Sequence, residues 1–293
     1  MGKQKNVIAL GFFDGVHLGH QALLKACRRL AEQHGCHPGV VTFDAHPKTL
    51  VADQAPALLN TIEDRVRLLR SYGITELILL PVTRELMTTH WADFLRQLVD
   101  GGAAGFVCGS DFRFGSGGLG TAKKLEAFCK KQQLPYAIVP QQLLHEIRIS
   151  STHIRQLLEE GDMAQAIRFL GHPHMLTGTV VTGRQLGRTI GIPTANLQIP
   201  EGILTPRFGV YACLAHFDGQ TRMAVTNVGT RPTVQGDHVT VEPWLLDFSG
   251  NLYGKTLTLE FHAFLRSEKT FASLEALKEE IAGDAQRTRA FFN

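Results

Sequence analysis

Several features that mark specialised protein classes are scarce in this sequence. Its five cysteines are an odd number without a C-x-x-C pair, which argues against a disulfide framework and against a zinc site. The net charge is only +3 and no long basic run occurs, so we expect no nucleic-acid partner. No apolar run is long enough to span a membrane or to form the core of a secretion signal. We therefore expect a cytoplasmic chain without a membrane partner.

The composition is that of an ordinary globular chain, because 44% of the 293 residues are hydrophobic and 19% are charged. This length predicts about two domains. In the first half, strand-like apolar runs alternate with segments whose apolar residues recur at helical spacing. The predicted strands are 7–10, 39–43, 76–82, 104–108 and 136–139, and the predicted helices are 18–34, 61–72, 91–98 and 123–130. This alternation predicts a doubly wound parallel sheet that binds ligands at the carboxyl ends of its strands.

The segment GFFDGVHLGH, residues 11–20, lies between the first predicted strand and the first predicted helix. Peptide N–H groups at the start of a helix carry partial positive charge and bind anions. Gly19 would let a phosphate approach the backbone. His17 and His20 could donate hydrogen bonds to oxygens that gain charge during phosphoryl or nucleotidyl transfer. The alternative is that both histidines are capping or surface residues, but the strand-turn-helix context favours an anion site.

Two further segments end at the same predicted sheet edge. Asp44 follows the second strand and could accept a hydrogen bond from a ribose, bind a cation, or only form a turn. The segment GSDFRFG, with Asp111 and Phe112, follows the fourth strand. Its aromatic residues suit stacking on a planar ring, or they anchor the loop to the core.

A run of hydroxyl residues precedes the next helical pattern. Ser151 and Thr152 belong to this run, and Arg148 and Arg155 bracket it. One hydroxyl is enough to cap a helix, which is the simpler interpretation. Hydroxyls, a helix N-terminus and two guanidinium groups together favour a pyrophosphate site.

After residue 171 the pattern changes to short strands separated by Gly, Asp, Asn and Pro clusters. The predicted strands are 177–182, 210–215, 223–227, 239–246 and 256–261, and a last helix follows with Leu274, Leu277 and Ile281 on one face. This pattern predicts an antiparallel barrel or sandwich closed by a helix. We therefore expect one domain over residues 1–173 and a second over 174–293.

The second domain carries its own candidate phosphate and metal site. Gly187, Arg188 and Gly191 lie in a glycine-rich segment that precedes Thr194 and Asn196. In an extended segment these last two residues face the same way, so a hydroxyl and an amide oxygen could share one Mg²⁺. The alternative is a glycine-rich loop with polar turn residues.

Glu242 lies inside an apolar predicted strand, where an unpaired carboxylate is costly to bury. A carboxylate that points into a ligand pocket can accept a proton from a substrate hydroxyl. A structural salt bridge is the competing interpretation, and the strand pattern leaves both open.

Two segments match nucleotide-binding motifs only in part. Residues 115–120, GSGGLG, fit G-x-G-x-x-G, but they start several residues after their strand and no acidic residue follows about twenty residues later. We interpret them as a loop and keep a dehydrogenase as a minor hypothesis. Residues 250–256, GNLYGKT, are one residue short of a Walker A loop and precede a predicted strand instead of a helix, so we predict a hairpin turn.

The order and separation of many motifs resemble the bifunctional riboflavin kinase and FAD synthetase of bacteria. The motifs are GFFDGVHLGH, TFDAHP, GSDFRFG and ISSTHIR in the first half, and GRTIGIPTANL, GVYA, NVGTRPTV, VEPWLLDF, LYGK and LRSEKTF in the second. The resemblance implies an N-terminal FMN adenylyltransferase domain, of the nucleotidylyltransferase type with a Rossmann-like sheet, and a C-terminal riboflavin kinase barrel. It implies riboflavin, FMN, FAD and ATP as ligands, and Mg²⁺ as a cofactor.

The resemblance also implies roles for single residues. His17 and His20 would contact ATP phosphates, and Glu242 would act as a base. Arg266 would lie on a loop over the flavin. Arg148, Ser151, Thr152 and Arg155 would hold the triphosphate, Asp111 would lie in the nucleotide and flavin cleft, and Thr194 and Asn196 would bind Mg²⁺ with ATP. We add Gly19, Gly187, Arg188 and Gly191 to the phosphate-binding set and Asp44 and Phe112 to the flavin-binding set.

Three other functions stay open at this point. The first is a riboflavin kinase whose N-terminal domain binds nucleotide without turnover, the second is a nucleotidylyltransferase for a different substrate, and the third is a non-catalytic flavin-binding protein. The sequence leaves the oligomeric state open.

Overall fold

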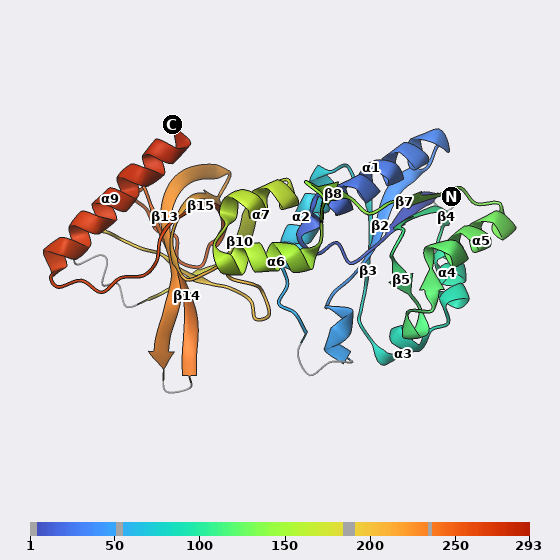
Figure 1. Ribbon diagram of the computed structural model, residues 1–293, viewed down its shortest axis with the longest axis horizontal. Helices are drawn as coiled ribbons and strands as arrows, with labels where there is room; N and C mark the ends of the chain where they lie inside the picture. Colours follow the sequence, from blue (N-terminus) through green and yellow to red (C-terminus); the bar gives the residue numbers. More distant parts are fainter. Residues whose placement is uncertain (1–4, 51–54, 184–190, 234–235) are drawn as a thin grey trace. The chain divides into compact units, whose positions relative to one another are not determined.

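The computed structural model describes residues 5–50, 55–183, 191–233 and 236–293, which form two compact units (Figure 1). The N-terminal unit comprises residues up to 58 together with 62–151, and the C-terminal unit comprises 59–61 and 152–293. The predicted boundary after residue 173 lies later in the chain. The difference arises because α7 (Met163–Leu170) and nearly all of α6 (Ser151–Glu160) group with the C-terminal unit, where α7 packs on the barrel.

A five-stranded parallel sheet forms the centre of the N-terminal unit, as predicted. Its strand order is β3-β2-β1-β4-β7, which places the first strand in the middle. The strands are β1 (Asn6–Leu10), β2 (His37–Phe43), β3 (Glu76–Leu80), β4 (Ala103–Gly109) and β7 (Tyr136–Val139). This is the doubly wound arrangement, in which the strand order reverses next to the first strand and creates a ligand crevice at its carboxyl end.

Helices cover both faces of this sheet. They are α1 (Leu18–Gln33), α2 (Ile62–Ser71), α3 (Arg84–Thr88), α4 (Trp91–Asp100) and α5 (Ala122–Gln132). Alternate residues of β1 enter two different apolar clusters, with Val7 packed against α1 and α2, and Ile8 packed against α4 and α5. A strand that is buried on both faces has to be apolar at every position, which is why its sequence shows a continuous apolar run.

Two short hairpins follow β4 and β7 along the chain. The first pairs β5 (Arg113–Phe114) with β6 (Gly120–Thr121), and the second pairs β8 (Leu143–Leu144) with β9 (Ile147–Arg148). The G-x-G-x-x-G segment, residues 115–120, forms the turn of this first hairpin and ends at the first residue of β6. It therefore does not connect a strand of the parallel sheet to a helix. This agrees with its interpretation as a loop and argues against a dinucleotide-binding motif.

The C-terminal unit is a closed antiparallel barrel with a terminal helix, as the sequence predicts. The strand order around the barrel is β10-β11-β14-β13-β12-β15. The strands are β10 (His174–Val181), β11 (Asn196–Gln198), β12 (Gly209–Phe217), β13 (Gln220–Thr233), β14 (Gly236–Leu245) and β15 (Thr256–Arg266), and α9 (Leu274–Phe292) packs on β12 and β13. The short strand β11 was not predicted, because three residues are too few to show an alternating pattern.

The interpretation of residues 250–256 as a hairpin turn is wrong. β15 follows this segment, but β14 pairs with β11 and β13 while β15 pairs with β10 and β12. The segment therefore connects two strands that are not neighbours in the barrel, and the sequence pattern of a turn does not reveal which strands it joins.

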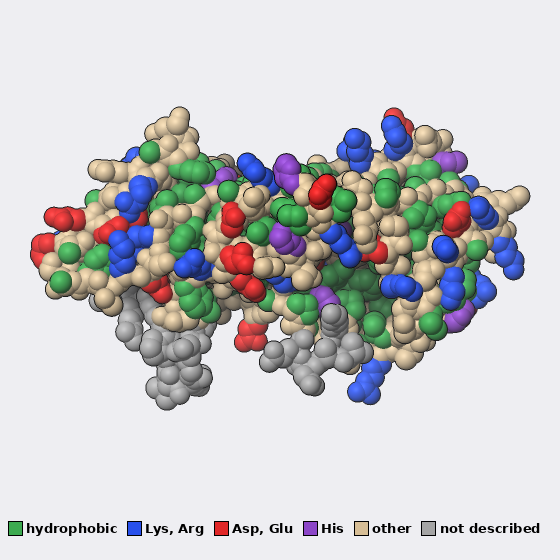
Figure 2. All heavy atoms as spheres, viewed as in Figure 1, with side chains coloured by type: hydrophobic (Ala, Val, Ile, Leu, Met, Phe, Trp, Pro, Cys, Tyr) green, Lys and Arg blue, Asp and Glu red, His purple; other side chains and the backbone are tan. Residues whose placement is uncertain are grey.

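No helix in the described part of the chain is both long enough and apolar enough to cross a membrane. On the face that Figure 2 displays, basic and acidic side chains both occur over both units. This mixture is consistent with the small net charge of +3.

Candidate active sites

The loop after β1 has an unusual backbone. Phe13 and Val16 adopt positive φ angles of 57° and 39°, and Gly15 between them has a φ of 79°. A β-branched residue such as Val16 rarely adopts this conformation, and such strain persists only where surrounding packing enforces it. Both side chains are fully buried, which supplies that packing. The loop between β1 and α1 is therefore held rigidly in a shape that the sequence alone does not indicate.

His17 and His20 lie together at the start of α1. His17 is the N-cap residue, and its Nδ1 accepts a hydrogen bond from the backbone N–H of His20 at 3.3 Å. The two imidazole rings stack with their centroids 3.7 Å apart. Burial, His17 and Arg65 all lower the pKa of His20 well below 6.5, so this imidazole is neutral at pH 7. The capping alternative is thus correct for His17, and it does not exclude a role toward a ligand.

A cavity of about 320 Å³ opens at this end of the sheet. It is bounded by the loops that follow β1, β4 and β7 and by residues 148–151. The predicted site residues that line it are His17, Gly19, His20, Asp111, Phe112, Arg148 and Ser151. The structure thus brings together residues that are far apart in the sequence, at the edge where a doubly wound sheet binds its ligands.

Polar contacts connect three of these lining residues to their surroundings. Arg148 forms an ion pair with Asp111, and both side chains are about half exposed. The Ser151 hydroxyl donates a hydrogen bond to the Asp14 carbonyl at 2.9 Å. Ser151 is therefore attached directly to the loop that precedes His17.

Three other predicted residues are not among those that line this cavity. Thr152 and Arg155 lie on α6, in the part that groups with the C-terminal unit. Asp44 instead accepts a hydrogen bond from the Val82 N–H at 2.9 Å, which ties the ends of β2 and β3 together. Its position fits the turn interpretation, and its predicted contact with a flavin stays a prediction without geometric support.

A second cavity of about 270 Å³ in the N-terminal unit has a largely aromatic lining. Phe43, His46, Phe94 and Phe114 contribute to it. Phe12 and Phe112 line both this cavity and the first one. Adjacent cavities, one with histidine, arginine and hydroxyl groups and one with aromatic rings, suit a ligand that has both a phosphate chain and a planar ring system.

Arg65 contacts Phe12, which lines both cavities, and the sequence analysis did not identify it. Its side chain is 1% exposed, Nη1 donates to the Phe43 carbonyl at 2.9 Å, and the guanidinium stacks on the Phe12 ring at 4.5 Å. Burial lowers the pKa of Arg65, and Asp14 opposes that shift. A usable signal existed, because Arg65 is three residues after Ile62 and four before Leu69, on the buried stripe of the predicted helix.

The barrel holds a cavity of about 550 Å³ that Glu242 lines. Asn227 is the antiparallel partner of Glu242, so the two side chains lie side by side on one face of the barrel wall. Trp244 and Val225 add apolar wall, and α9 closes the opposite side with Leu274, Leu277, Ile281 and Asp284. A cavity with apolar walls and a few carboxylate and amide groups is typical of a small-molecule site.

Next to it, a cavity of about 630 Å³ is bounded by Pro193, Thr194 and residues 248–253. Thr194 lines both barrel cavities. Asn196 begins β11, and its side-chain amide fills the space beside Gly183. Gly191 lies in a turn next to Ile192, with a φ of 79°. Gly187 and Arg188 lie outside the described residues.

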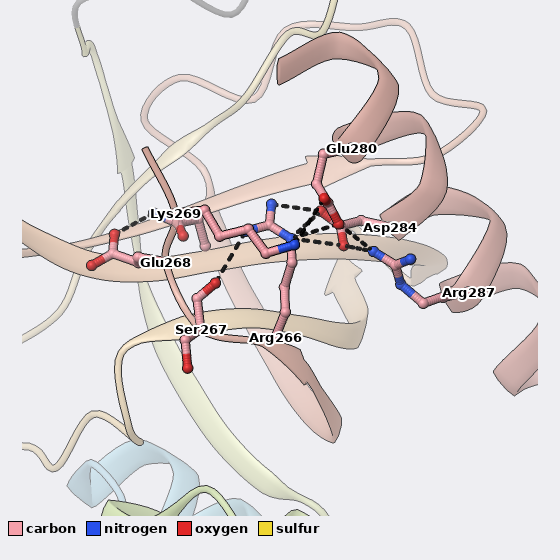
Figure 3. Close-up of polar contacts among 8 residues, drawn as sticks. Arg266, Ser267, Glu268, Lys269, Glu280, Asp284 and Arg287 are labelled. Carbon is pink, nitrogen blue, oxygen red and sulfur yellow. Dashed lines mark hydrogen bonds and ion pairs between the residues drawn. The ribbon is translucent and has the colours of Figure 1, made fainter. Parts of the chain in front are cut away.

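Arg266 lines the cavity that holds Glu242, but its guanidinium already has partners (Figure 3). Nε and Nη2 donate to the Asp284 carboxylate, the latter at 2.8 Å, and Nη1 donates to the Ser267 carbonyl at 3.1 Å. The side chain is 13% exposed. The resemblance implied that Arg266 lies on a loop over the flavin, but Arg266 is the last residue of β15, and its role in flavin binding stays a prediction. The sequence analysis did not identify Asn227 or Asp284. They lie on β13 and α9, and no local motif indicates that these two elements line one cavity.

Two family models match the two parts of the chain. The FAD synthetase model covers residues 1–153, and the riboflavin kinase model covers residues 170–292. With a doubly wound sheet followed by a closed barrel, each bearing cavities suited to nucleotide and ring ligands, the chain is a two-domain transferase that acts on flavins and ATP.

Curated relatives cover nearly the whole chain. One from Pseudomonas fluorescens is 38% identical over 97% of this chain and 92% of its own length. One from Listeria monocytogenes is 34% identical over 98% of this chain and 92% of its own length. Both are named bifunctional riboflavin kinase/FMN adenylyltransferase, and the chain belongs to this family. It phosphorylates riboflavin to FMN with ATP, and it adenylylates FMN to FAD with release of pyrophosphate.

A solved structure also resembles the chain over both units. It is the crystal structure of a protein from Streptococcus pneumoniae that is named a macrolide-efflux protein, with a TM-score of 0.90, 30% identity, and coverage of 99% of this chain and 95% of its own. The likeness supports the architecture described above, and the name belongs to that other protein alone. The predictions of fold class, family, activities and substrates are thereby confirmed.

Proposed function

We propose that each reaction takes place in its own unit. FMN adenylylation would occur at the paired cavities beside His20, and riboflavin phosphorylation at the paired barrel cavities. The observation that carries the barrel assignment is that Thr194 lines both barrel cavities while Glu242 lines one of them. Two cavities that share a wall residue can place a phosphoryl donor and an acceptor hydroxyl next to each other, as in-line transfer requires.

In the kinase reaction, riboflavin would occupy the cavity with Glu242 and Trp244, and ATP the cavity bounded by residues 248–253. The apolar side chains of α9 and Trp244 suit the isoalloxazine ring. Glu242 would take the proton from the ribityl hydroxyl as that oxygen attacks the terminal phosphate of ATP. Asn227, beside Glu242, could hold the carboxylate or the hydroxyl in place through its amide.

Mg²⁺ would be held with ATP by Thr194 and Asn196, as the sequence predicts. No group of three or more His, Cys, Asp or Glu side chains in the described ranges could hold a metal ion. A hydroxyl and an amide oxygen fit Mg²⁺ only if phosphates and water supply the remaining ligands, which is how this ion is commonly bound. When bound, the ion offsets negative charge on the phosphates.

In the adenylyltransferase reaction, the FMN phosphate is already ionised and needs no base. The protein would align it with the α-phosphate of ATP and stabilise charge on the departing pyrophosphate. His17, Gly19 and His20 line the cavity, so the N-terminal amides of α1 and the two imidazoles would face this charge, and Gly19 would leave the backbone accessible. Arg148 would exchange its contact with Asp111 for a phosphate. The aromatic cavity beside Phe12 and Phe112 would hold the flavin ring.

The test measures both reactions in each of two variants. Glu242→Gln should lower FMN formation from riboflavin by about 10²-fold to 10⁴-fold, the usual contribution of a general base, and leave FAD formation from supplied FMN unchanged. His20→Asn should reduce FAD formation by about tenfold or more and leave FMN formation unchanged. Glu260→Gln is the matched control, because this barrel glutamate contacts His216 and His262 and lies outside both barrel cavities.

The outcome that contradicts separate sites is a variant that stops both reactions while its folded content, measured by circular dichroism, is unchanged. Retention of more than a tenth of the kinase rate in Glu242→Gln would exclude Glu242 as the base.

We also propose that the protein works in the cytoplasm. All five of its cysteines are free thiols, and both reactions consume ATP, which agrees with a reducing compartment that supplies nucleotide.

A further inference from the structure

The end of β15 is joined to α9 through a buried carboxylate (Figure 3). Arg266 is the last residue of the strand, and its Nη2 donates to Asp284 Oδ2 at 2.8 Å while Nε lies 3.2 and 3.1 Å from the two carboxylate oxygens. The Asp284 side chain is only 1% exposed. Arg287 also donates to Asp284, at 2.6 Å. A buried carboxylate with charged partners on both sides fixes the position of the arginine, because leaving either charge unpaired is costly.

Glu280, one helical turn before Asp284, extends this group of contacts to the loop. It accepts from Lys269 Nζ at 2.9 Å and from Arg287 Nη2 at 2.9 Å, and it lies 3.4 Å from Arg266 Nε. Hydrogen bonds from Lys269 and Arg287 lower the pKa of Glu280, so it is ionised at neutral pH. We call Glu280 and Asp284 the α9 carboxylate pair. Together they bind Arg266 and Lys269, which lie at the two ends of the segment 266–269.

Residues 266–271, which include this segment, form part of the cavity that contains Glu242. Arg266, Glu268, Lys269 and Phe271 all line it. The Arg266 guanidinium also lies 5.8 Å from the centre of the Phe271 ring. Glu268 accepts a hydrogen bond from the Asn227 amide at 3.4 Å. Residues 266–271 therefore close one side of the cavity, and contacts with α9 determine where that side lies.

We propose that the α9 carboxylate pair acts as a set of positioning residues for riboflavin, holding residues 266–271 in the place where they complete the flavin cavity. Neither carboxylate has a chemical role in phosphoryl transfer. The proposal rests on the assignment of riboflavin to this cavity.

A physical property of the substrate makes this role measurable. Riboflavin carries no net charge, so its binding by direct contact has little dependence on ionic strength. Lys269 and Glu280 are partly exposed, with 51% and 23% of their side chains accessible, and salt screens such pairs. If these ion pairs hold the cavity wall, the affinity for an uncharged ligand becomes salt-dependent.

The experiment compares Glu280→Gln with Glu279→Gln in the full chain. Riboflavin affinity is followed by quenching of flavin fluorescence, and KM and kcat of the kinase are measured in parallel. Glu280→Gln should raise the Kd and the KM for riboflavin about five- to tenfold with kcat changed less than about twofold, the effect of losing two or three partly exposed ion pairs. Glu279, an exposed residue of the same helix that forms no ion pair with the described part of the chain, is the matched control and should show no change.

The salt series provides a second readout. Raising KCl from about 0.02 M to about 0.5 M should increase the riboflavin Kd of the unaltered protein about threefold, and this increase should disappear in Glu280→Gln. An unchanged riboflavin Kd in Glu280→Gln, with or without a lower melting temperature, would overturn the proposal. A change confined to the KM for ATP would also overturn it.

A further variant separates failure of this proposal from failure of the flavin assignment. Leu277→Trp places a large ring on the α9 wall of the cavity and leaves both carboxylates of the α9 carboxylate pair unsubstituted. Loss of riboflavin binding in Leu277→Trp together with normal binding in Glu280→Gln would remove only the positioning role. A normal KM for riboflavin in the kinase reaction of Leu277→Trp would show that the riboflavin that is phosphorylated binds elsewhere, and both proposals would then be wrong.

Discussion

Lowering the pH should destabilise the barrel through one buried histidine. His174 begins β10, is 2% exposed, and lies 5.9 Å from the Phe261 ring. Burial, with a smaller effect of His172, lowers the pKa of His174 from 6.5 to about 4, against a hydrogen bond to the Leu204 backbone that raises it. Between these two values the unfolded chain binds a proton that the folded barrel does not. The free energy of unfolding therefore falls as the pH drops through this window.

The magnitude follows from the size of the shift. A change of one pKa unit corresponds to about 1.4 kcal/mol, so the full difference amounts to about 3 kcal/mol, of which about 2 kcal/mol is lost by pH 5. This is a large part of the total stability of a domain.

Glu260 affects the free energy of unfolding in a different pH range. Its pKa is lowered by His262 and His216, so its stabilising effect is present at neutral pH and is lost only below the usual range of a glutamate.

Two tryptophans make the measurement possible. The sequence contains only Trp91, in the N-terminal unit, and Trp244, in the barrel. In a Trp91→Phe background, Trp244 fluorescence reports barrel unfolding alone. Urea unfolding at several pH values between 7.5 and 5 gives the free energy of unfolding by linear extrapolation. We expect the free energy of unfolding to decrease between pH 7.5 and 5 by about 2 kcal/mol less in His174→Phe and His174→Gln than in the background protein.

The test compares how steeply the free energy of unfolding changes with pH in each protein. Its absolute value is not used, because either substitution can also shift stability at all pH values. If the His174 variants show the same pH dependence as the background protein, the burial argument for this histidine is wrong.

Two further predictions concern the N-terminal unit and the thiols. In Gly19→Ala the new methyl group would lie 3.1 Å from the His17 ring, so we expect FAD formation to fall by about tenfold as that ring is displaced, while FMN formation in the same sample stays constant. Burial raises the pKa of Cys27 to about 11 and the pKa values of Cys108, Cys129 and Cys213 to about 12. We expect a thiol reagent at pH 8 to modify only Cys36 rapidly in the native protein and all five cysteines after unfolding, and rapid reaction of a second thiol would contradict this burial.

The fold was largely predictable because its main elements leave periodic patterns. β1 and β4 are nearly continuous apolar runs, and the predicted helices between the sheet strands show one apolar face each, so the parallel sheet follows from known connection rules. β11 and the partners of β14 were not predictable. Barrel closure depends on contacts between strands far apart in the chain, and a three-residue strand carries no period.

The candidate sites divide along a similar line. Residues in short motifs at strand ends, such as His17, His20 and Asp111, could be predicted, because a parallel sheet brings its carboxyl ends together. Asp44 shows the limit of this argument, since a residue at the correct edge can still point into a backbone contact. Arg65 and Asp284 were missed, because a buried charge is recognised by its partners and the partners come from other elements.

The shared position of Thr194 has a consequence for the order of events in the barrel. Thr194 lines both barrel cavities, and in the proposed kinase reaction one cavity holds ATP and the other holds riboflavin. Phosphoryl transfer would then require a ternary complex, in which the acceptor receives the group directly from the donor and no phosphorylated side chain is formed. Either substrate alone would leave the other half of the barrel mouth filled with water.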